Sequence, residues 1–78
     1  MMLELEEARK MLNVHQQECA RMVINASSTA GKLAWYYTFC GALELARDLK
    51  IVPDDTFANL SEIWQLFAMK HIHNDREE

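Results

Sequence analysis

Helix-breaking residues are scarce in this chain of 78 residues, which contains one proline and two glycines. Together these two residue types make up about 12% of an average sequence, because turns depend on their backbone geometry. A chain with so few of them forms a small number of long elements. Its apolar residues recur every three or four positions, which is the period of a helix and not of a strand. The sequence therefore predicts an all-α fold.

Two interruptions divide the chain into three helices, expected at residues 3–26, 30–49 and 54–72. At the first interruption, Ser28 or Thr29 is expected to cap the second helix, because hydroxyl side chains favour caps over helix interiors. At the second, Pro53 ends one helix and starts the next. Short connections make successive helices antiparallel, and residues 73–78 are expected to fray. A single continuous helix through the first interruption remains the alternative.

The second helix is expected at the centre of one three-helix antiparallel domain, because it is apolar almost all the way round. Gly41 in its middle suggests that a backbone or a large ring packs closely there. A core of this size contributes only about 3–5 kcal/mol, and two short helices cannot cover the second helix completely. We therefore expect self-association, with a dimer favoured. The residues expected in the core or interface are Trp35, Phe39, Leu43, Phe57, Leu60, Trp64 and Phe67.

Aromatic residues are the candidate contact points, because large rings dominate the binding energy of protein interfaces. Trp35, Tyr36 and Tyr37 are consecutive, so they cannot all face the inside of a helical domain. At least one of them is expected to be exposed or to lie at an interface. The full set of candidate partner or oligomer contacts is Trp35, Tyr36, Tyr37, Phe39, Trp64 and Phe67.

No motif for a cofactor or a metal ion is found. The pair Gly31-Lys32 resembles the end of a phosphate-binding loop, but Leu33 stands where that loop needs Ser or Thr. His71 and His73 are two positions apart, whereas metal-binding pairs on a helix need a spacing of three or four. We therefore expect no cofactor, no metal site and no enzymatic activity.

The two cysteines, Cys19 and Cys40, lie on apolar helical stripes and are expected to be free thiols that pack as small apolar side chains. Residues 1–10 contain no apolar core of a secretory signal. No apolar run approaches the roughly 20 residues that a membrane helix needs. From these features we expect a cytoplasmic protein without membrane contact.

Nucleic-acid binding is not expected, because the formal net charge is −4. The alternative to consider is a helix-turn-helix regulator built from residues 45–57. Lys50 occupies the position where that motif has Gly in its turn. Asp54 and Asp55 open the helix that would read DNA, and their carboxylates would repel phosphates.

Residues 37–64 resemble a hairpin that is common in short phage and prophage proteins. The shared pattern is an aromatic-Gly-Ala-Leu helix around Gly41, a short apolar turn, an acidic cap, and the spacing from Leu60 to Trp64. Lys50 departs from it, since Gly would usually end such a helix. The resemblance implies a small accessory protein of a mobile element and carries over no site residue.

These observations predict a small protein–protein interaction module without catalytic activity. The narrower expectation is an accessory protein or inhibitor that binds a host protein. The alternative function is a small transcriptional regulator of the helix-turn-helix type.

Overall fold

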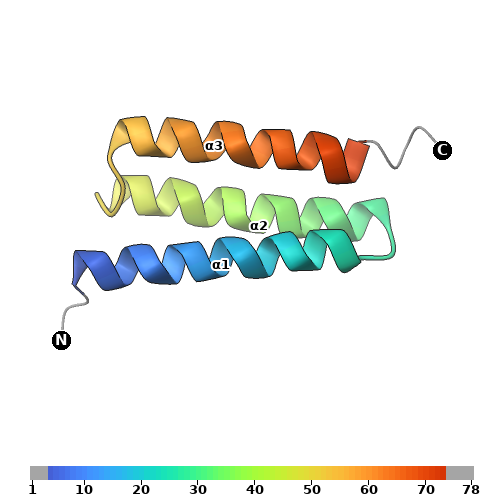
Figure 1. Cartoon of the computed structure of the whole chain (residues 1–78), viewed down its shortest axis with the longest axis horizontal. Helices are drawn as coiled ribbons and strands as arrows, with labels where there is room; N and C mark the ends of the chain where they lie inside the picture. The colour runs from blue at the N-terminus through green and yellow to red at the C-terminus, as the bar shows by residue number, and fades with distance from the viewer. Residues whose placement is uncertain (1–3, 74–78) are drawn as a thin grey trace.

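The protein folds into three antiparallel helices (Figure 1), as seen in a computed structural model that describes residues 4–73, with the backbone alone for His73. The helices are α1 (Leu5–Asn25), α2 (Thr29–Asp48) and α3 (Asp54–Ala68), and α3 continues into a π-helical turn, η1 (Met69–His73). In Figure 1, α2 lies between α1 and α3. The predicted all-α fold is confirmed.

A turn separates α1 from α2, so the alternative of one continuous helix is wrong. Ala26 has extended backbone angles and ends α1. Ser28 is the N-cap of α2, and its hydroxyl oxygen accepts a hydrogen bond of 3.0 Å from the backbone N–H of Gly31. This bond satisfies one of the N–H groups that lack a partner at the start of a helix. His73, which was expected in the tail, belongs to η1, and residues 74–78 lie outside the described part of the chain.

The end of α2 has the hydrogen bonds of a Schellman motif, with a lysine in place of the usual glycine. The backbone N–H of Lys50 donates to the carbonyl of Arg47, and that of Ile51 donates to the carbonyl of Ala46. This pairing requires left-handed backbone angles at the first of the two donors, Lys50. Lys50 has φ 65°, and no other non-glycine residue in the range 4–73 has a positive φ. Glycine adopts this conformation without steric cost, whereas lysine does not.

The core consists of two clusters in which side chains from all three helices meet. One joins Cys19 of α1 to Phe39 and Leu43 of α2 and to Trp64 of α3. The other joins Val23 to Ala68 and Ile72 at the end of the molecule where α1 turns into α2. Trp64 also donates from its indole nitrogen to the backbone carbonyl of Tyr36 at 2.9 Å. A buried indole N–H needs such a partner, and this bond fixes α3 against α2.

Candidate protein-binding surface

The three consecutive aromatic residues of α2 point in different directions. Tyr36 is half-buried and stacks on Trp64 with ring centroids 5.9 Å apart and planes within 6°. Trp35 is also half-buried and packs against both core clusters. Tyr37 is 63% exposed. Within residues 4–73, the only aromatic ring that it contacts is that of Tyr36, in an edge-to-face arrangement. Tyr37 therefore remains a candidate contact point, and the other two rings mainly hold the helices together.

Phe39 and Trp64 were expected as contact points, but the chain itself encloses them. Phe39 is 0% exposed and Trp64 is 2% exposed, and their rings meet edge to face at 4.9 Å. Phe67 is half-buried and stacks on the other side of Trp64, also at 4.9 Å. Because these three rings already fill the core, Phe39 and Trp64 offer no surface to a partner of the folded chain. The spacing of these aromatic residues in the sequence therefore reflects the packing of α2 against α3.

One face of α2 stays open, although its apolar composition suggested that it would be covered on all sides. The exposed residues of this face include Ala34, Tyr37, Thr38, Gly41, Glu44 and Leu45. No backbone or ring lies near Gly41, because a Cβ atom added there would meet nothing within 4 Å. The close neighbour expected at Gly41 is therefore absent from the described part of the chain. Small residues predominate on this face, and α1 and α3 cover the opposite one.

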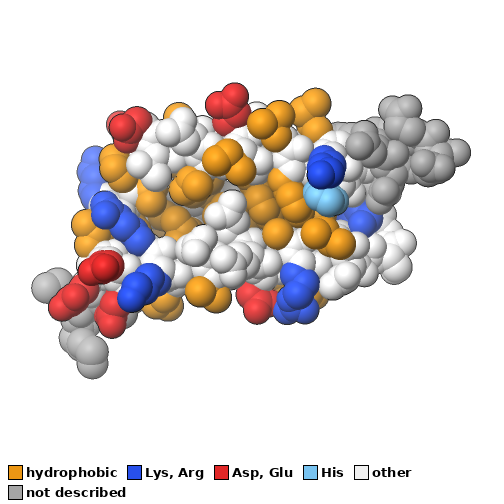
Figure 2. Space-filling view, viewed as in Figure 1, with side chains coloured by type: hydrophobic (Ala, Val, Ile, Leu, Met, Phe, Trp, Pro, Cys, Tyr) orange, Lys and Arg blue, Asp and Glu red, His pale blue; other side chains and the backbone are white. Residues whose placement is uncertain are grey.

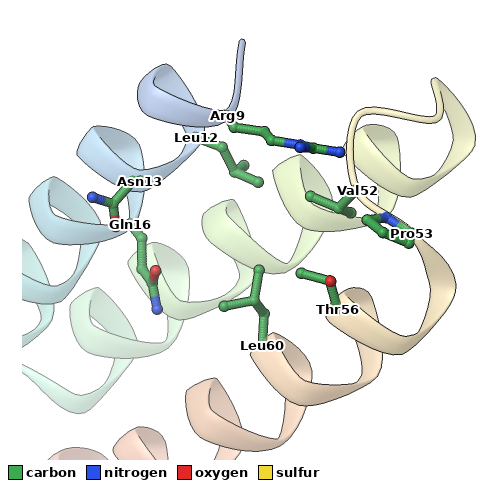
Figure 3. Close-up of a pocket in the computed structure, with 8 residues that line it drawn as sticks. All are labelled: Arg9, Leu12, Asn13, Gln16, Val52, Pro53, Thr56 and Leu60. Atoms are coloured by element: carbon green, nitrogen blue, oxygen red, sulfur yellow. The ribbon is translucent and has the colours of Figure 1, made fainter. Parts of the chain in front are cut away.

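A groove lies between α1 and the start of α3 (Figure 3). It encloses about 280 Å³. Arg9, Leu12, Asn13 and Gln16 of α1 line one side, and Val52, Pro53, Thr56 and Leu60 line the other. In Figure 3 the side chains of Leu12, Val52 and Leu60 point toward the space between the two helices. The groove therefore has an apolar floor and a rim that is polar and mostly uncharged.

Two features keep this groove open while fixing its walls. Val52 is buried at its base, and Leu12 and Leu60 are only half-buried, so these two leucines do not close over the space between the helices. Arg9 crosses from α1 toward the turn between α2 and α3 (Figure 3). There its Nε atom donates to the backbone carbonyl of Ile51 at 2.8 Å. This bond ties the N-terminal half of α1 to the turn that precedes α3.

Figure 2 shows one face of the molecule, where apolar side chains gather along the middle, over α2 and toward α3. Acidic and basic side chains lie mostly around the edges of this face. An apolar centre with a charged border is typical of surfaces that bind other proteins. Apolar surface with a polar border is thus found outside the groove as well.

Cys19 and Cys40 do not have the lowered pKa that a nucleophilic thiol requires. The Sγ atom of Cys19 lies 3.7 Å from Nε2 of His15, but burial raises the pKa of the Cys19 thiol, and the Glu18 carboxylate raises it further. Burial also raises the pKa of the Cys40 thiol, and Glu44 adds to that effect, while a hydrogen bond with Tyr36 opposes it. A nucleophilic cysteine needs a lowered pKa. Both thiols are free, as expected.

The described residues also contain no cluster of side chains that could hold a metal ion. Within residues 4–73, no group of three or more His, Cys, Asp or Glu side chains could hold a metal ion. His71 packs against the ring of Phe67, with centroids 4.5 Å apart. Gly31 and Lys32, which resembled part of a phosphate-binding loop, contribute to helix ends instead: the N–H of Gly31 donates to Ser28, the N-cap of α2, and Nζ of Lys32 donates to carbonyls near the end of α1.

Comparisons with protein-family models, with curated proteins and with solved structures found no match to this chain. None of the described helices combines the length and the apolar character that crossing a membrane requires.

The groove between α1 and α3 was not predicted from the sequence. Four of the residues that line it lie on α1, and the other four come about forty residues later in the chain. No spacing within one helix marks them as partners. The only local signal was Pro53, which sets the angle at which α3 departs from the turn.

Proposed function

We propose that this chain is a protein-binding module that receives a segment of its partner in the groove between α1 and α3. The observation that carries the proposal is the open apolar floor formed by Leu12, Val52 and Leu60 beneath a polar rim. Grooves between helices that combine these features suit an apolar anchor from another protein. Neutral side chains on the rim can exchange hydrogen bonds with a partner without the cost of burying a charge.

The chemistry of the rim indicates what kind of segment fits. Arg9 is the only charged residue among those lining the groove. Its Nε atom already donates to the backbone carbonyl of Ile51, and the guanidinium group carries further N–H donors that suit a carboxylate. The proposed occupant is therefore an apolar side chain on a helical or extended segment, with an acidic residue beside it.

The proposal includes binding without catalysis. Its support is the chemistry of the thiols, whose pKa values are raised, and the use of Lys32 as a cap for α1. The narrower proposal, an accessory protein or inhibitor of a mobile element that binds a host protein, is supported by the resemblance of residues 37–64 to a phage and prophage hairpin.

The alternative, a helix-turn-helix regulator, receives no support from the arrangement of α2 and α3. In that motif the two helices cross at about 90–120°, whereas here they run side by side as a hairpin (Figure 1). Asp54 and Asp55 occupy the first turn of α3, where a reading helix would approach phosphates.

Two matched substitutions test the groove. Gln16 lines the groove, whereas its neighbour Gln17 is exposed and lies outside the lining. The variant Gln16→Trp is expected to fill the groove and to abolish recovery of the partner when the tagged chain is purified from its source cells. The variant Gln17→Trp introduces the same ring and is expected to recover the partner as the unmodified chain does. Mass spectrometry of the co-purified proteins gives the measurement.

Equal recovery with both variants would show that the partner binds elsewhere and would refute the groove as the docking site.

The salt dependence of binding distinguishes a protein-binding module from the alternative function, a DNA-binding regulator. DNA binding weakens steeply as salt rises, because it releases counterions from phosphates, whereas an apolar groove contact does not. A DNA complex that dissociates in this way would favour the regulator.

A further inference from the structure

The outer face of α3 and its extension carries large apolar side chains that the rest of the chain does not cover. Ile63 is 54% exposed, and Leu66 and Met69 are each 58% exposed. These residues follow one another at intervals of three, so they lie on neighbouring turns of one helical face. In Figure 1, α3 lies along one side of the molecule, with α2 between it and α1, so its outer face points away from both. Three uncovered apolar residues in a row are a candidate interface.

Opposite charges flank this face. Glu62 precedes Leu66 by four residues, Lys70 follows it by four, and both are exposed. Among the described residues, no ion pair joins either of them to another side chain. The face is therefore symmetric in position about Leu66 and opposite in charge: Ile63 and Met69 lie three residues away on either side, and Glu62 and Lys70 lie four residues away.

We infer that this face binds the same face of a second copy of the chain, with the two α3 helices antiparallel around a two-fold axis at Leu66. In that arrangement Leu66 meets Leu66 of the partner subunit, and Ile63 meets Met69 of the partner subunit. Glu62 lies level with Lys70 of the partner subunit, and the symmetry makes this ion pair twice. In each of these pairs the two residues lie the same number of positions from Leu66, on opposite sides of it.

The charge order selects this occupant and this direction. A parallel pairing would place Glu62 against its own copy and Lys70 against its own copy, and such like-charge contacts are unfavourable. The antiparallel pairing turns both into attractions. The interface is separate from the groove of the proposed function, since none of the residues that line the groove belongs to it. The inference also replaces the expectation that a second subunit covers α2.

Charge reversal tests the inference. The unmodified chain is expected to form a concentration-dependent dimer with twice the 9.1 kDa mass of one chain, measured by analytical ultracentrifugation. Glu62→Lys alone creates two lysine–lysine contacts, and Lys70→Glu alone creates two carboxylate–carboxylate contacts. Each is expected to raise the dissociation constant at least ~10-fold. Helical circular dichroism should remain unchanged, because both positions are exposed.

Restoration of the dimer is the decisive part of the experiment. An equimolar mixture of the two single variants pairs lysine with glutamate at both positions, so it is expected to form a heterodimer. The double variant Glu62→Lys/Lys70→Glu is expected to form a homodimer again. Glu44→Lys, an equal charge change on the exposed face of α2, is the control and should leave the dimer intact.

A further variant covers the case in which the apolar contacts dominate. Leu66→Glu places two carboxylates at the two-fold axis and is expected to give a folded monomer. The inference is overturned if the unmodified chain is monomeric up to millimolar concentration, or if Leu66→Glu stays dimeric. It is also overturned if the mixture of single variants stays monomeric, or if a different protein occupies this face while the chain shows no self-association.

Discussion

The ammonium nitrogen of Lys32 in α2 lies 2.9 Å from the backbone carbonyl oxygen of Val23 in α1. It lies 3.4 Å from the carbonyl of Ile24 as well. Carbonyls in the last turn of a helix have no partner within that helix, and the helix dipole makes this end negative. The last turn of α1 contains no basic residue of its own. Lys32 therefore provides, from the next helix, the cation that α1 lacks, and it is buried while doing so.

The variant Lys32→Met is expected to lower the free energy of unfolding by about 1–3 kcal/mol. Methionine keeps the length and apolar character of the stem but leaves the carbonyls of Val23 and Ile24 without this donor, and hydrogen bonds to charged groups contribute amounts of that order. Urea denaturation gives the measurement. Lys10→Met removes an exposed lysine from α1 and should change stability by less than about 0.5 kcal/mol. Equal effects of the two variants would refute a capping role for Lys32.

The variant Lys50→Gly is expected to raise the free energy of unfolding by about 1 kcal/mol. Lys50 holds φ 65°, which costs a residue with a Cβ atom about 1–2 kcal/mol, and glycine is free of this cost but has a more flexible unfolded state. Lys50→Ala is the matched control. It removes the charge but keeps the Cβ atom, so it should give no comparable gain. If alanine stabilises as much as glycine, the effect comes from the charge and not from the backbone.

Phe39 and Tyr37 are expected to respond in opposite ways to truncation. Phe39→Ala removes a fully buried ring and should lower the free energy of unfolding by about 3–5 kcal/mol. A loss of this size equals the whole contribution of so small a core, so most molecules should unfold. Tyr37→Ala removes an exposed ring and should cost less than about 1 kcal/mol. Thermal denaturation followed by circular dichroism separates the two. A large loss of stability from Tyr37→Ala would contradict the placement of Tyr37 on the exposed face of α2.

Stability is expected to fall as the pH rises above about 9. Folding raises the pKa values of Cys19, Cys40 and Tyr36, in each case mainly because burial disfavours the charged form. The folded state therefore keeps protons that the unfolded state loses above its own pKa values, and the free energy of unfolding decreases with pH in that range. Below the unfolded pKa values this stabilisation is fully present.

Urea denaturation at pH 7 and at pH 9.5 measures this decrease. The variant Cys19→Ala/Cys40→Ala lacks both thiols, so its stability should fall less over the same interval than that of the unmodified chain. A decrease of the same size in the two proteins would show that the thiols do not cause it.

The sequence by itself determined the number of helices and their ends to within a few residues. Those ends depend on interactions between residues near each other in the chain: Ser28 bonding to Gly31, Pro53 at the start of α3, and acidic residues in its first turn. A period of three to four residues was enough to predict helices and to exclude strands. The break between α1 and α2 followed from the same local chemistry.

Only the tertiary structure decided which way each helix is turned about its axis. That rotation buries Phe39 and leaves Tyr37 and Gly41 in solvent, although all three lie within the same apolar stretch. It also determines that Lys32 reaches the end of α1. The groove, too, depends on how far apart Arg9 and Pro53 come to lie across more than forty residues of chain. Helix formation is governed by neighbours within about four positions, whereas these features arise from packing between helices, which no local pattern in one sequence records.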